Sequence, residues 1–91
     1  MVLILAHKYS YKYFPDSDNY ERRTIENKTT GKKTVYEFNT QGTEKVKTVY
    51  EYNDKGQVKK KTKVENGETL TYIYNSYNEK GKVTSLTSIK N

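Results

Sequence analysis

The chain has 91 residues, a length that suits one domain, and its 17 basic and 11 acidic residues give a net charge of +6. Only 32% of the residues are hydrophobic and 31% are charged, so the 10 tyrosines and 2 phenylalanines have to supply much of the apolar surface that folding buries. Cysteine is absent and His7 is the only histidine, which excludes disulfides and thiolate metal sites and predicts a protein that is not an enzyme and holds neither metal nor cofactor.

The first predicted element is an N-terminal apolar strand within residues 1–13. It begins with Met1-Val2-Leu3-Ile4-Leu5, which is far too short to span a bilayer and lacks the basic start and the small-residue cleavage site of a signal peptide. It ends in Tyr9-Ser10-Tyr11-Lys12-Tyr13, which looks like a degenerate copy of an aromatic motif found later in the chain. Pro15 cannot donate to a strand ladder and therefore separates this strand from the next.

From about residue 19 to residue 89 the chain is predicted to consist of tandem hairpins marked by glycine. The five glycines are 11, 14, 11 and 14 residues apart, which is a double period of 25 residues. Three of them end a segment that reads aromatic residue, Asn, polar residue, Gln or Lys, Gly, namely Phe38–Gly42, Tyr52–Gly56 and Tyr77–Gly81. A polar pair followed by Gly fits a three-residue loop in which the glycine has a positive φ. Structural turns are predicted at Gly42, Gly56, Gly67 and Gly81.

The segments between these turns are predicted to be strands, because Tyr, Phe, Val and Thr favour the pleated environment and no segment shows helical periodicity. The predicted fold is all-β, an antiparallel meander of about six to seven strands in a single domain of residues 1–91. The strands are expected near residues 2–13, 19–28, 32–39, 43–53, 57–64, 68–77 and 82–89.

The turns also predict the register of the side chains. A three-residue loop closed by Gly56 places Val46 opposite Val64. The next turn has two interpretations, a three-residue loop Glu65-Asn66-Gly67 or a two-residue turn Asn66-Gly67, and the Asn-Gly dipeptide usually favours the shorter one. Since the two differ by one residue, they place the following tyrosines on opposite faces. The longer loop keeps the tyrosines together, and we therefore predict that loop.

The predicted register gives a sheet with two different faces. One face gathers aromatic residues expected to bind a partner, namely Tyr36, Phe38, Tyr50, Tyr52, Tyr72 and Tyr74. The other gathers lysines, namely Lys45, Lys47, Lys59, Lys61 and Lys63. The aromatic face exceeds what a monomer usually leaves bare. We therefore expect either the apolar residues 2–5 or a second copy of the chain to cover it, and a homodimer is favoured.

Two functions are compatible with these faces. The leading expectation is an interaction module, protein-binding or self-associating through the tyrosine-rich face, including a small secreted effector or a phage-type inhibitor. The alternative is binding of nucleic acid or another polyanion through the lysine face. The lysines also fit a solvated face that discourages edge-to-edge aggregation. Stacking of single-stranded nucleic acid needs aromatic residues among the lysines, and the predicted register, which separates the two, counts against it.

Over about residues 35–89 the chain resembles the YD repeats of RHS-type and other bacterial surface proteins. The unit of that family runs tyrosine, a spacer, Tyr-Asp, two residues, Gly and a hydrophobic residue. The segment Tyr50–Val58 is close to this pattern, and Tyr77–Val83 keeps its second half, with Asn53 and Asn78 where the family has Asp. The resemblance implies a hairpin architecture and a bacterial, surface or secreted, non-catalytic module.

Overall fold

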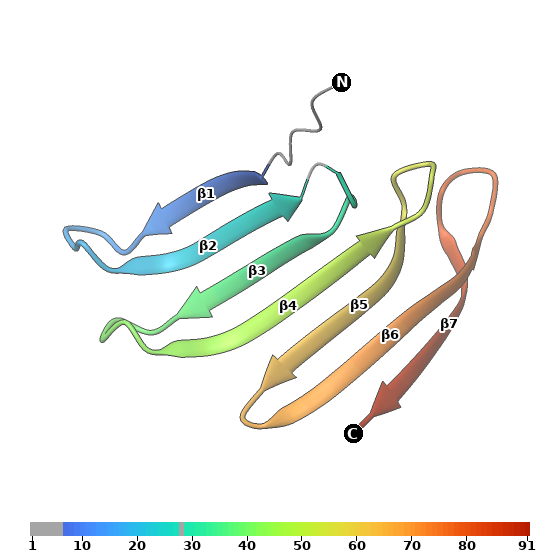
Figure 1. The fold of residues 1–91 in the computed structure, drawn as a ribbon. Coiled ribbons are helices and arrows are strands. Elements are labelled where there is room, and N and C mark those ends of the chain that lie inside the picture. Colours follow the sequence, from blue (N-terminus) through green and yellow to red (C-terminus); the bar gives the residue numbers. More distant parts are fainter. Residues whose placement is uncertain (1–6, 28) are drawn as a thin grey trace.

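The computed structural model describes residues 7–27 and 29–91, which form one seven-stranded sheet without a helix among them (Figure 1). The strands lie side by side in the order of the sequence, and each pairs antiparallel with the next. The predicted all-β meander is therefore confirmed. Residues 2–6 of the predicted first strand lie outside the described residues. The strands are β1 (His7–Tyr13), β2 (Tyr20–Asn27), β3 (Lys33–Phe38), β4 (Glu44–Tyr52), β5 (Val58–Glu65), β6 (Glu68–Tyr77) and β7 (Val83–Lys90).

The loops that begin at Asn39, Asn53 and Asn78 share one pattern of backbone hydrogen bonds. In each loop the Asn amide donates to the carbonyl oxygen four residues later, and the glycine amide donates back to the Asn carbonyl oxygen. Gly42, Gly56 and Gly81 have φ values of 86°, 81° and 82°. The predicted three-residue loops with a left-handed glycine are confirmed at these positions.

The predicted three-residue loop at 65–67 is wrong. Glu65 pairs directly with Glu68, so only Asn66 and Gly67 form the turn between β5 and β6. Their φ values are 54° and 75°, as a type I′ turn requires at both central residues. Asn tolerates the left-handed region because its short polar side chain bonds locally, and the twist of this turn matches the twist of the two strands.

Two β-bulges shift the register away from the predicted one. Lys45 in β4 and Lys59 in β5 are extra residues, with no residue opposite them in β3 and β4 respectively. Val46 therefore lies opposite Glu65, and the predicted pair of Val46 with Val64 is wrong. Because side chains alternate along a strand, a shift of one residue moves every later partner to the other face.

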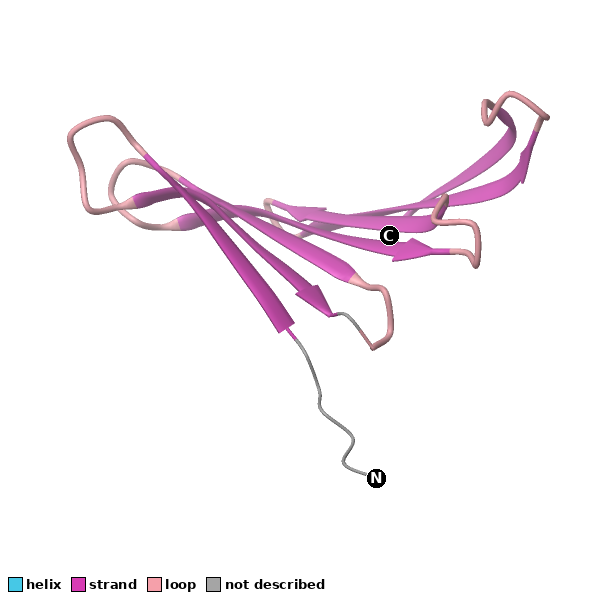
Figure 2. Cartoon of the chain, turned by 90° about the horizontal axis from the view of Figure 1, so that it is seen from above, coloured by secondary structure: helices cyan, strands magenta, loops and turns pink. Residues whose placement is uncertain are grey.

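The sheet is a single twisted layer, and nothing within the described residues covers either face (Figure 2). None of their hydrophobic side chains is buried, and the one buried side chain is Thr48 in the central strand β4, at 5% exposure. The radius of gyration is 15.6 Å, against about 12 Å for a compact domain of this length. The accessible surface is 6878 Å², against about 5,500 Å² for a compact monomer of this mass. The fold therefore leaves both faces open to a partner.

Candidate functional site

On one face of the sheet, lysines and tyrosines alternate from strand to strand. Lys33, Tyr50, Lys61 and Tyr72 lie directly opposite one another across β3, β4, β5 and β6. Opposed residues project from the same face, so these four side chains form one row. Side chains two residues further along a strand join the same face. We call this side of the sheet the lysine–tyrosine face. The residues at its centre are Lys33, Tyr50, Tyr52, Lys61, Tyr72 and Tyr74.

The ammonium groups of this face lie over the tyrosine rings. Lys61 Nζ is 5.8 Å from the ring centroid of Tyr50 and 5.6 Å from that of Tyr72, and Lys33 Nζ is 5.9 Å from that of Tyr50. These distances fall within the range of cation–π attraction. Tyr50 and Tyr52 also stack, with centroids 6.5 Å apart and ring planes at 21°. The row is thus an ordered array of rings and cations.

The row borders a shallow hollow and a tyrosine with a shifted pKa. The hollow has a volume of about 250 Å³ and is lined by Arg22, Thr24, Lys33, Val35, Glu37 and Tyr50.

Partial burial is the main cause that raises the pKa of Tyr52 above its usual value of 10.0, and the nearby Tyr50 and Glu26 raise it further. At neutral pH its phenol is therefore a hydrogen-bond donor as well as an acceptor.

The opposite face carries an uncharged row that crosses all seven strands. Most of its residues are β-branched, and such side chains pack well on a pleated surface. The charged strand residues that pair on this face lie to either side of the row, and they are Arg23, Glu44, Lys47, Glu51 and Lys60. We call this surface the β-branched face. The residues of its row are Tyr9, Ile25, Thr34, Val49, Thr62, Thr71 and Ile89.

An aromatic cluster extends the β-branched face over β1, β2 and β3. The Tyr20 ring centroid lies 4.8 Å from Tyr11, 5.2 Å from Tyr13 and 6.3 Å from Phe38. The Arg23 guanidinium lies 4.7 Å above the Tyr36 ring. The cluster is open to solvent, since Tyr11 and Tyr13 are 46% and 51% exposed. The sequence-based prediction missed this part of the surface, although the alternating tyrosines of β1 place their rings on one side of a strand.

The predicted aromatic face is correct for four of its six residues. Tyr50, Tyr52, Tyr72 and Tyr74 share the lysine–tyrosine face. Tyr36 and Phe38 project from the β-branched face, so their predicted placement is wrong. The cause is the bulge at Lys45, because of which Tyr36 lies opposite Lys47.

The five lysines predicted to share a face do not do so. Lys61 and Lys63 lie on the lysine–tyrosine face, opposite Tyr72 and Leu70. Lys47 lies on the β-branched face with its Nζ 5.7 Å from the Tyr36 ring centroid, and Lys45 and Lys59 are the bulge residues. The bulges thus break up the lysine face and place Lys61 among tyrosines.

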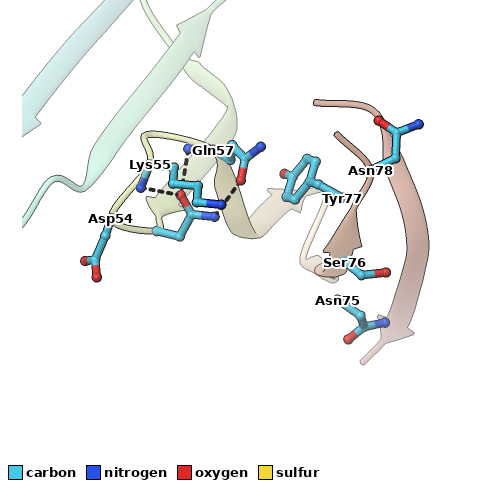
Figure 3. Close-up of a pocket in the computed structure, with 8 residues that line it drawn as sticks. Asp54, Lys55, Gln57, Asn75, Ser76, Tyr77 and Asn78 are labelled. Atoms are coloured by element: carbon cyan, nitrogen blue, oxygen red, sulfur yellow. Dashed lines mark hydrogen bonds between the residues drawn. The ribbon is translucent and has the colours of Figure 1, made fainter. Parts of the chain in front are cut away.

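A groove of about 410 Å³ separates the loop of β4 and β5 from the end of β6 (Figure 3). Several of its polar side chains already bond within the chain. The Tyr77 hydroxyl donates to the Val58 carbonyl oxygen, and Asn53 Nδ2 donates to Gln57 Oε1 at 2.9 Å. Asn75 Nδ2 donates to Thr87 Oγ1, also at 2.9 Å. The groove therefore offers a ligand fewer polar groups than its composition indicates. Its lining residues are Asn53, Asp54, Lys55, Gln57, Asn75, Ser76, Tyr77 and Asn78.

His7, the only histidine of the sequence, lies beside an amide. Its Nε2 is 3.4 Å from Asn27 Nδ2. Over residues 7–27 and 29–91, His, Asp and Glu side chains form no group of three or more that could hold a metal ion. Nor does that part of the chain contain a helix long and apolar enough to cross a membrane.

Comparison of the chain with protein families, curated protein sequences and solved structures finds no match.

Proposed function

We propose that this chain is a non-enzymatic interaction module whose β-branched face packs against a protein layer, with a second copy of the chain as the favoured partner. The observation that carries the proposal is the combination of an uncharged row across seven strands with the absence of any buried hydrophobic side chain among the described residues. A sheet that exposes Ile, Val and aromatic side chains gains free energy when another layer removes them from water.

The size of the exposed surface supports a protein partner. The accessible surface of 6878 Å² exceeds that of a compact monomer by about 1,400 Å². A stable interface buries about 800 Å² on each partner, so covering one face removes an area of the right order. Two copies related by a twofold axis present identical rows to each other, with sheets about 10 Å apart.

The charges of the β-branched face suit the rim of such an interface. Arg23, Lys47, Glu51 and Lys60 flank the uncharged row and do not interrupt it. Interfaces are depleted of charge at the centre and polar at the rim. The apolar residues 2–5, which lie outside the described residues, are the other candidate cover expected from the sequence.

We propose likewise that the hairpins at Asn39, Asn53 and Asn78 are repeat units related to YD repeats, in a bacterial surface or secreted protein. Their common backbone hydrogen bonds support this relation. A hairpin unit specifies architecture and no chemistry, so the relation agrees with a binding role.

A charge placed in the uncharged row tests this function. Ile25→Lys puts a cation into the row, and its neighbour Thr24→Lys puts the same cation on the opposite face of β2. Because a charge buried between two sheets loses its hydration, we expect Ile25→Lys to weaken dimerisation at least tenfold. Thr24→Lys should leave it nearly unchanged. Size-exclusion chromatography with light scattering over a dilution series measures the effect, and circular dichroism checks that both variants fold. Equal dimerisation of both variants would remove the β-branched face as the interface.

A further inference from the structure

We propose that the lysine–tyrosine face binds single-stranded nucleic acid, with bases stacked on Tyr50 and Tyr72 and phosphates held by Lys33 and Lys61. This function is separate from the proposed protein interface, because it uses the other side of the sheet. The main support for this proposal is that lysine and tyrosine side chains alternate, in register, across the four strands β3 to β6. Rings that stack bases beside cations that track the backbone are the two parts of a sequence-tolerant single-strand site.

The spacing of the row suits a chain of nucleotides. Neighbouring strands are about 4.8 Å apart, so Tyr50 and Tyr72, which lie two strands apart, are separated by about 10 Å. Lys61 lies between them, within 6 Å of both rings. A flexible single strand can therefore place a base on each ring and a phosphate near the lysine between them. The lysine side chain has four rotatable bonds, so its ammonium can move from the ring face to a phosphate when a base takes its place.

The two cations of the row are available for phosphate. Over the part of the chain that the structure describes, the ammonium groups of Lys33 and Lys61 form no ion pair, whereas Lys63 is held by Glu65 at 3.5 Å. Arg22 shares the hollow with Lys33 and Tyr50, where the opposed Glu37 offsets its charge. The overall charge of +6 favours the approach of a polyanion.

The acids of the same face lie mainly away from the row. Glu65 and Glu68 project near the opposite end of the strands, in the row of Val46. Glu37 belongs to that row as well, but it lies opposite Arg22 and also lines the hollow beside Lys33 and Tyr50. Glu68 also pairs with Lys90 at 3.7 Å. Glu26 is the acid in register with Lys33. A strand of nucleic acid is therefore expected to lie across β3–β6 over the tyrosines and away from the glutamate end.

Stacking also predicts which polyanions bind weakly. The bases of a duplex are paired and stacked on one another, so their faces cannot reach the tyrosines. Inorganic polyphosphate has the charge but no bases. A site that worked by charge alone would bind all three ligands, whereas this row should prefer the single strand.

The experiment is fluorescence anisotropy of the intact chain with a labelled 12-nucleotide oligo(dT) or oligo(U), with an unlabelled duplex and polyphosphate as competitors. Tyr50→Leu and Tyr72→Leu should each weaken single-strand binding by about 5- to 150-fold. Lys61→Gln should weaken binding and lower the slope of log affinity against log salt by about 0.7, the value for one phosphate contact. Binding of either oligonucleotide supports the proposal, and the tighter one identifies the class of strand.

The matched control is Lys47→Gln, which removes an ammonium held 5.7 Å from the Tyr36 ring on the other face. It lowers the net charge by the same amount and should leave the salt slope unchanged. Circular dichroism confirms that each variant keeps the sheet. The proposal is overturned if Lys47→Gln weakens single-strand binding as much as Lys61→Gln, or if polyphosphate competes as strongly as an unlabelled single strand. Normal binding by the tyrosine variants, or no binding at low salt, would also overturn it.

Discussion

At the scale of single residues, one asparagine oxygen organises each of the three similar loops. Oδ1 of Asn39, Asn53 and Asn78 accepts hydrogen bonds from the backbone amides two and four residues later, at 2.9–3.0 Å. This local bond is the reason that Asn precedes each polar pair and Gly. The sequence showed the repeated Asn, and the preference of Asn and Asp for such turns is the signal that identifies its role.

This role of the oxygen predicts different effects of two substitutions at Asn78. Asn78→Ala removes the acceptor of both amides and should lower the free energy of unfolding by about 1–3 kcal/mol, the sum of two ordinary hydrogen bonds. Asn78→Asp keeps an acceptor oxygen and should cost much less. Urea denaturation followed by circular dichroism measures both. If Ala and Asp destabilise the protein equally, the loop does not depend on the oxygen.

At the scale of elements, the sequence predicted the number of strands, their approximate bounds and their order, because glycine spacing and β-propensity are local signals. The register that it predicted was wrong past the bulges. The bulge at Lys59 and the short turn at Asn66 each shift the pairing by one residue, in opposite senses. The two shifts cancel, so Tyr50 and Tyr72 share a face as predicted. The side chains of β5, which lies between them, project from the faces opposite to those predicted. Lys61 therefore takes the place in the row that was predicted for Lys60.

The position of a bulge cannot be predicted from the residue pattern of either strand. The lysine–tyrosine row could therefore not be predicted from the sequence. The residues of β5 and β6 are compatible with either pairing, and only the position of the extra residue decides which side chains meet. The site was predicted in part, as tyrosines that share a face. The lysines among them depend on the tertiary register.

The turn between β5 and β6 offers a direct test of the register. Asn66 and Lys55 each precede the glycine of a hairpin, but among the described non-glycine residues only Asp16 and Asn66 have a positive φ. Asn66→Ala should therefore lower the free energy of unfolding by about 1–2 kcal/mol, the cost of left-handed backbone for a residue with a Cβ. Lys55→Ala should have little effect. Chemical denaturation of the two variants measures the change in the free energy of unfolding. An equal loss in both variants would favour a three-residue loop at both turns.

At the scale of the whole molecule, the sheet differs from an ordinary small domain in having no buried apolar layer within residues 7–27 and 29–91. Hydrophobic burial is the main favourable contribution to folding, and domains are built from at least two packed layers. Both considerations point to a partner as part of the stable form. Since the two proposed sites use opposite sides of the sheet, the proposed protein layer and the proposed nucleic acid do not compete.

We expect a second copy of the chain to form the missing layer. Sedimentation equilibrium of the intact chain, and of a version that lacks residues 1–6, tests it most directly. Both species should sediment as dimers, with twice the chain mass of 10.7 kDa for the intact protein. The shortened version should keep the circular dichroism of a β-sheet. An intact chain that stays monomeric at high concentration, together with unfolding of the shortened version, would contradict the claim and show that the N-terminal residues themselves cover the sheet.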